Sequence, residues 1–133
     1  MKSKYLVLIP IIIIFTVIIL LVVPKNNYDY SNLEVLVKTK NNKETKVNLY
    51  NNEKYKIQNK LKRLSFSEVR NKTDCLISGN YIISFDNNII KFDDDCGIVF
   101  FKSNKDDEYK EIHFSKSLKK YIINLAKKRV KWH

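Results

Sequence analysis

The chain has 133 residues, with 25 lysines and arginines against 14 acidic residues and a formal net charge of +11. A chain of this length fits one small domain and excludes a multidomain enzyme with a large enclosed active site. Gly and Pro number two each and hydrophobic residues make up 44%, which excludes collagen-like and low-complexity proteins and favours a packed core over wholesale disorder.

The first predicted element is an apolar helix, because the stretch from Tyr5 to Val23 contains no charged residue. A helix of this length covers about 28 Å, close to the roughly 30 Å of a hydrocarbon core. We therefore expect residues 1–24 to be an uncleaved transmembrane signal-anchor. A cleaved signal peptide is the alternative, but its apolar region would be shorter and small residues would follow it. Lys2 and Lys4 precede the segment, so the positive-inside rule predicts a single-pass cell-membrane protein with a cytoplasmic N-terminus and the C-terminal domain outside.

Beyond the anchor we expect a short linker over residues 25–31 and one extracytoplasmic domain over residues 32–133. Alternating apolar and polar residues predict two strands that form a hairpin, one through residues 33–37 and one through residues 47–49. An amphipathic helix follows, because apolar residues recur three and four positions apart over 57–64. Two asparagines in front of it are expected to cap its first turn, and these are Asn51 and Asn52.

The second half of the domain predicts more strands and a final helix. Strands are expected over residues 81–85, 89–92, 98–101 and 109–114, where turn residues separate alternating or continuous apolar runs. Ser115 is placed to cap a helix that carries one clear apolar stripe. The predicted fold class is therefore α+β, a small antiparallel sheet with two amphipathic helices packed on it.

Positive charge gathers near the end of the chain. No acidic residue follows residue 112, and seven cations lie on the final helix and beyond it: Lys116, Lys119, Lys120, Lys127, Lys128, Arg129 and Lys131. Such a basic face attracts polyanions, and it is our candidate polyanion-binding site. The alternative is compositional, because a chain rich in Lys, Asn and Ile is typical of an AT-rich genome, which places lysines at any solvated position.

Cys75 and Cys96 are the only cysteines, and two cysteines in an extracytoplasmic domain predict a disulfide. The bridge needs Cα atoms within about 7 Å, so we expect either a sheet that is not a simple meander or a sheet end folded back at Cys96. A redox pair is disfavoured because the chain has no C-x-x-C motif. Zinc is disfavoured because two cysteines and two distant histidines lack ligand spacing.

The remaining polar motifs give no catalytic candidate. The acidic runs 93–95 and 106–108 are interpreted as solvated turns, because neither has the spacing of a calcium loop. His113 is expected to point outward from a strand, and the chain has neither a nucleophile elbow nor a glycine-rich phosphate loop. We therefore expect no catalytic residue, no metal site, no cofactor and no enzymatic activity.

The segment from Cys75 to Phe85, the pair Cys96-Gly97, and Tyr109–Ser115 followed by a helix resemble small extracytoplasmic proteins of low-G+C Gram-positive bacteria. Those are lipoproteins or single-pass membrane proteins, mostly of unknown function. The resemblance covers roughly residues 47–125, and this chain lacks a lipobox cysteine. It implies location and fold class, and it carries no catalytic residue across.

The predicted function is that of a membrane-anchored extracytoplasmic binding or accessory module. Its basic C-terminal helix would contact anionic lipid, a wall polymer or an acidic protein. The alternative is a protein-interaction role, as an immunity-type protein or a subunit of a membrane complex, through a sheet face or edge. No nucleic-acid partner is expected, because the domain is predicted to lie outside the membrane and arginines, which base readers favour, are few.

Overall fold

The computed structural model describes residues 2–22, 26–69, 79–94 and 96–130 of the chain. Six strands form one antiparallel sheet in the order β2-β1-β3-β4-β5-β6. The elements are α1 (Lys2–Val22), β1 (Glu34–Lys38), β2 (Glu44–Lys46), α2 (Asn51–Lys62), β3 (Tyr81–Phe85), β4 (Asn88–Phe92), β5 (Val99–Lys102), β6 (Lys110–Ile112) and α3 (Lys116–Arg129). The α+β class, the antiparallel sheet and the two amphipathic helices are thus confirmed.

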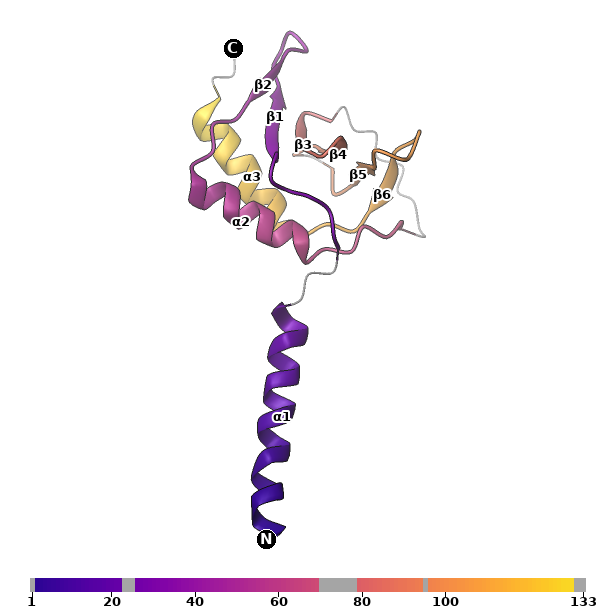
Figure 1. Cartoon of the computed structure of the whole chain (residues 1–133). Helices are drawn as coiled ribbons and strands as arrows, with labels where there is room; N and C mark the ends of the chain where they lie inside the picture. The colour runs from indigo at the N-terminus through magenta and orange to yellow at the C-terminus, as the bar shows by residue number, and fades with distance from the viewer. Residues whose placement is uncertain (1, 23–25, 70–78, 95, 131–133) are drawn as a thin grey trace.

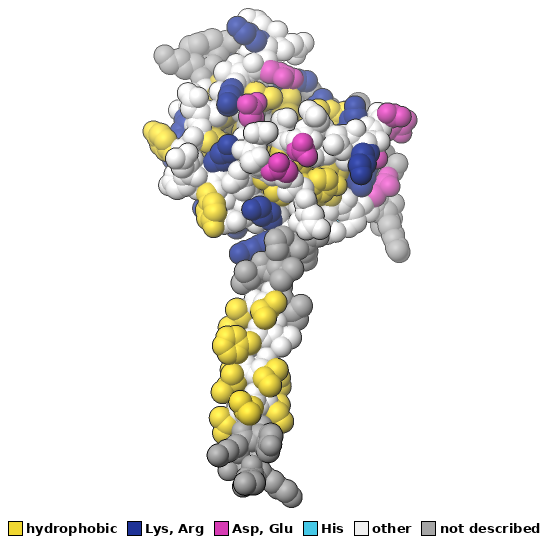
Figure 2. Space-filling model, viewed as in Figure 1, with side chains coloured by type: hydrophobic (Ala, Val, Ile, Leu, Met, Phe, Trp, Pro, Cys, Tyr) yellow, Lys and Arg dark blue, Asp and Glu magenta, His cyan; other side chains and the backbone are white. Residues whose placement is uncertain are grey.

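The first helix does not bear out the predicted anchor. α1 points away from the sheet and from the other two helices (Figure 1), and its apolar side chains face outward along the described part of the helix (Figure 2). Among the residues described above, no helix is both long and apolar enough to cross a membrane.

The predicted transmembrane signal-anchor is therefore wrong, and so is the single-pass location with a cytoplasmic N-terminus and an outer domain.

One row of side chains across the sheet shows how the core is built. Val35 pairs with Ile83, Ile83 with Ile90, and Ile90 with Phe101, so the four lie on the same face of four adjacent strands. All four are buried in one cluster with residues of α2 and α3. Both helices therefore cover the same face of the sheet, as Figure 1 shows.

The hairpin between β3 and β4 turns on two residues with positive φ. Asp86 has φ 47° and Asn87 has φ 62°, the pattern of a two-residue type I′ turn, which matches the twist of paired strands. Asn88 is buried and secures the turn, because its side-chain amide donates to the carbonyl of Phe85 at 3.0 Å and its oxygen accepts from the backbone N–H of Asn104 at 2.9 Å. The turn predicted at this place is confirmed.

The segment before β1 packs against the end of α2. The side-chain amide of Asn26 donates to the carbonyl oxygens of Leu61 and Leu64, both at 2.8 Å. Those carbonyls lie where a helix runs out of internal donors, so Asn26 satisfies them. Tyr30 is only 2% exposed and donates its hydroxyl to Asn26 at 2.6 Å. The stretch expected to be a linker is thus packed against the domain at these two residues.

Candidate anion-binding site

α3 presents its lysines to solvent because of how the helix is placed. Ser115 is its N-cap and accepts a hydrogen bond from the backbone N–H of Leu118 at 3.3 Å, as the sequence predicted. Leu118, Ile122 and Leu125 are buried against the sheet. Since these side chains share one face at helical spacing, the lysines between them lie on the flanks and the outer face.

One flank of α3 and the start of β5 enclose a hollow of about 430 Å³ that is open to solvent. Its walls are partly apolar and its cations come from one helix. We call it the lysine hollow, and its main lining residues are Lys116, Lys119, Lys120 and Lys127, with Val99, Phe114 and Ile123. The structure therefore brings together four of the seven cations predicted from the sequence.

Lys119 is held inside the lysine hollow by the backbone. Its ammonium group donates a hydrogen bond to the carbonyl oxygen of Cys96 and lies 6.0 Å from the ring centroid of Phe92. Burial lowers the pKa of Lys119, and the charges of Asp94 and Asp93 partly oppose this. An anion that entered the hollow would meet an ammonium that is fixed in place and has already lost part of its hydration.

Among the described residues, Asp94 is the acidic residue that lines the hollow. Its carboxylate forms an ion pair with Lys127 at 3.0 Å, and both side chains are substantially exposed, at 35% and 55%. An exposed pair of this kind contributes roughly 0–1 kcal/mol. Lys127 can therefore exchange Asp94 for a ligand at small cost.

Asp93 has a different role from its neighbour. It is 8% exposed, and its carboxylate accepts hydrogen bonds from the backbone N–H groups of Asn80 at 2.7 Å and Gly79 at 3.4 Å. The interpretation of the acidic run as a solvated turn is therefore wrong for Asp93, which joins the end of β4 to the chain before β3. Asp95 lies outside the described residues.

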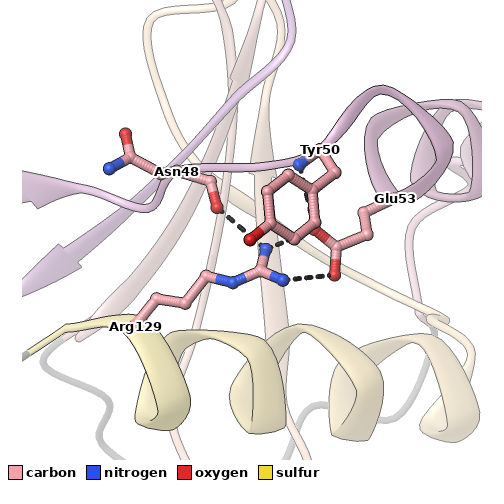
Figure 3. A network of polar contacts seen from close by, with 4 residues as sticks. All are labelled: Asn48, Tyr50, Glu53 and Arg129. Atoms are coloured by element: carbon pink, nitrogen blue, oxygen red, sulfur yellow. Dashed lines mark hydrogen bonds and ion pairs between the residues drawn. The ribbon is translucent and has the colours of Figure 1, made fainter.

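Arg129 lies apart from the hollow and has a structural role (Figure 3). Its guanidinium forms a two-pronged ion pair with Glu53 and donates to the carbonyl of Asn48 at 2.9 Å. It also lies 4.4 Å from the ring centroid of Tyr50. The hydrogen bonds from Arg129 are the largest cause that lowers the pKa of Glu53, and the same contact raises the pKa of Arg129.

Of the remaining two predicted cations, Lys128 is exposed and does not line the hollow, and Lys131 lies outside the described residues. The sequence did not point to Asp94, Val99 or Phe114 as neighbours of these lysines. Their proximity depends on where β5 and the end of β4 meet α3, and no local pattern in the sequence carries that information.

Of the two cysteines predicted to form a disulfide, the structure describes only Cys96. Cys96 is 4% exposed, and the described part of the chain has no free thiol. Cys75 lies outside the described residues, so its pairing with Cys96 stays a prediction. Within residues 2–22, 26–69, 79–94 and 96–130, no group of three or more His, Cys, Asp and Glu side chains could hold a metal ion.

The sheet edges bear on the alternative of a protein partner. β2 is only three residues long and carries Glu44 and Lys46. β6 is partly covered, because the backbone N–H of Val69 donates to the carbonyl of Glu111 at 2.9 Å. Short, charged or covered edges disfavour pairing with a strand from another protein. The protein-interaction alternative stays a prediction.

Comparison with protein-family models, with curated proteins and with solved structures gives no match to this chain. The resemblance drawn from the cysteine and strand pattern therefore stays a prediction.

Proposed function

We propose that the protein binds a phosphate-bearing anionic ligand in the lysine hollow. The observation that carries the proposal is that four lysines of α3 line one hollow, where Asp94 is the one acidic residue of the described chain that lines it with them.

The environment strengthens the attraction of these ammonium groups for an anion. Val99, Phe114 and Ile123 line the same hollow, and apolar walls lower the local dielectric constant and so strengthen charge interactions. Lys119 has lost part of its hydration and is positioned by Cys96. A ligand with a charged group and an apolar or uncharged body fits this combination.

The kind of cation favours phosphate over carboxylate. Arginine recognises planar carboxylates with two parallel hydrogen bonds, whereas lysine acts as a compact point charge. The cations that line the hollow are lysines wherever the chain is described, while Arg129 is engaged with Glu53. A tetrahedral phosphate, which accepts hydrogen bonds in many directions, suits such a set better than the carboxylates of an acidic protein.

The test uses the full chain and tripolyphosphate as the probe, with affinity measured by isothermal titration calorimetry. We expect Lys119→Gln to weaken binding about tenfold or more, and Lys116→Gln, at an exposed position, to weaken it severalfold. Lys128→Gln is the matched control, because it removes the same charge from the same helix outside the hollow and should change affinity less than twofold.

Two results would reject the proposal: no binding to the parent chain, or equal losses in Lys128→Gln and Lys119→Gln. Vesicles with and without anionic phospholipid distinguish the two sources of phosphate. Binding to anionic vesicles that depends on Lys119 and exceeds binding to tripolyphosphate assigns the ligand to a lipid headgroup. The reverse order assigns it to a soluble phosphate compound.

A further inference from the structure

A second hollow, of about 310 Å³, lies between α2 and α3. Lys56 and Lys60 of α2 line it, together with Tyr121 of α3. Lys120 and Asn124 line both this hollow and the lysine hollow. The two hollows therefore adjoin at the outer face of α3, and the positive charge continues from one into the other.

We propose that the two hollows form one track for a linear chain of phosphate groups that carries no bases, with Lys120 between the two halves. This inference rests on the proposed function and names its ligand class. In the part of the chain that the structure describes, six lysines line the track, and they are Lys56, Lys60, Lys116, Lys119, Lys120 and Lys127.

The extent of the track requires more than one phosphate. Lys116 and Lys127 are eleven positions apart on α3, which is about 16 Å along the helix axis. Lys56 and Lys60 are one turn apart on a different helix. A single phosphate cannot reach both ends, whereas a flexible chain that fills the first hollow presents further phosphates to the second at high effective concentration.

The aromatic residue of the second hollow argues against a nucleic acid. Proteins that bind single strands stack bases on exposed aromatic faces. The ring of Tyr121 is already covered by the ammonium group of Lys56, which lies 4.3 Å from its centroid. The track thus offers charge along its length without an open stacking platform at that point.

The experiment measures the affinity of the full chain for orthophosphate, pyrophosphate, tripolyphosphate and long-chain inorganic polyphosphate. We expect affinity per chain to rise at least tenfold from tripolyphosphate to long polyphosphate. Lys56→Gln combined with Lys60→Gln should remove that gain and leave tripolyphosphate binding within twofold of the parent. Lys54→Gln combined with Lys62→Gln removes the same charge from α2 outside both hollows, and it should keep the gain. Thermal melting confirms that each variant is folded.

The outcomes separate this inference from the proposed function. If long polyphosphate still depends on Lys119 but not on Lys56 and Lys60, the track is overturned and the lysine hollow stands alone. If no phosphate compound binds at any length, the proposed function falls and the track with it. If oligothymidylate with the same number of phosphates binds as tightly as polyphosphate through the same lysines, the assignment to a base-free chain is overturned.

Discussion

Arg129, in the last turn of α3, forms a two-pronged ion pair with Glu53, in the first turn of α2, and one of its N–H groups donates to Oε2 at 2.8 Å. Glu53 also accepts from the backbone N–H of Tyr50 at 2.9 Å. One carboxylate thus closes the start of α2 and joins it to the end of α3. Arg129 is thereby engaged in holding the two helices together, although it belongs to the basic run of the sequence.

This pair predicts a stability defect without a binding defect. Arg129→Gln leaves a partly buried carboxylate without its cation, and we expect the melting temperature to fall by roughly 5 °C. Affinity for tripolyphosphate should stay within twofold of the parent. A tenfold loss of affinity in a folded Arg129→Gln protein would contradict the structural role.

The same pair predicts a dependence of stability on pH. The pKa of Glu53 is lowered in the folded protein from an ordinary value of 4.5, mainly by hydrogen bonding to Arg129. A lowered carboxyl pKa stabilises the fold above the unfolded value, and that contribution is lost as the pH falls through the folded value. The difference in melting temperature between the parent and Glu53→Gln should therefore shrink as the pH falls below about 4.5. A difference that stays constant into that range would contradict this account.

The buried side-chain amide of Asn88 is expected to contribute to the free energy of unfolding. Asn88→Ala removes the side-chain donor to the carbonyl of Phe85 and the side-chain acceptor of the N–H of Asn104, and a buried group that loses its partner costs about 1–3 kcal/mol. Urea unfolding should show that the free energy of unfolding falls by this amount. Asn104→Ala is the control, because only the backbone of Asn104 takes part, and it should cost much less. Equal losses in the two variants would contradict the assignment.

Asp94 predicts a variant with tighter binding. Asp94→Asn removes the acidic side chain that lines the lysine hollow and frees Lys127 from its ion pair. We expect tripolyphosphate affinity to rise severalfold while stability changes little, because an exposed pair contributes roughly 0–1 kcal/mol. Weaker binding in Asp94→Asn would show that the carboxylate positions Lys127 for the ligand, contrary to this prediction.

The lowered pKa of Lys119 means that its ammonium group loses its proton at a lower pH than an ordinary lysine. Burial lowers it from the ordinary value of 10.5, whereas a phosphate near the ammonium group would raise it again. NMR titration of isotopically methylated lysines should show Lys119 titrating below the ordinary lysine value of 10.5. Addition of tripolyphosphate should move its midpoint upward. A midpoint that does not move on ligand addition would place the anion elsewhere.

Local patterns in the sequence predicted much of the fold. The turn at Asp86 and Asn87 and the cap at Ser115 follow from residues that act within a few positions of themselves. The start of α2 was predicted less well. Asn51 and Asn52 were expected to cap the helix, but Asn51 is its first residue, and Glu53 closes the first turn. That choice depends in part on Arg129, which is 76 positions away in the chain.

The candidate site could also be predicted only in part. The sequence predicted that α3 is basic, because its lysines are followed by no acidic residue. Which of those lysines face a hollow, and that Lys56 and Lys60 adjoin them, depends on how α2 and α3 pack over one face of the sheet. The length of the apolar N-terminal segment favoured a transmembrane anchor, whereas the described part of the chain holds no helix that is long and apolar enough.

The most direct test of the central claim is the affinity of tripolyphosphate for the full chain, compared with Lys119→Gln and with Lys128→Gln. We predict measurable binding to the parent, a loss of about tenfold or more in Lys119→Gln, and less than a twofold change in Lys128→Gln. Equal affinities in all three proteins, or losses that follow net charge alone, would contradict a phosphate-binding role for the lysine hollow.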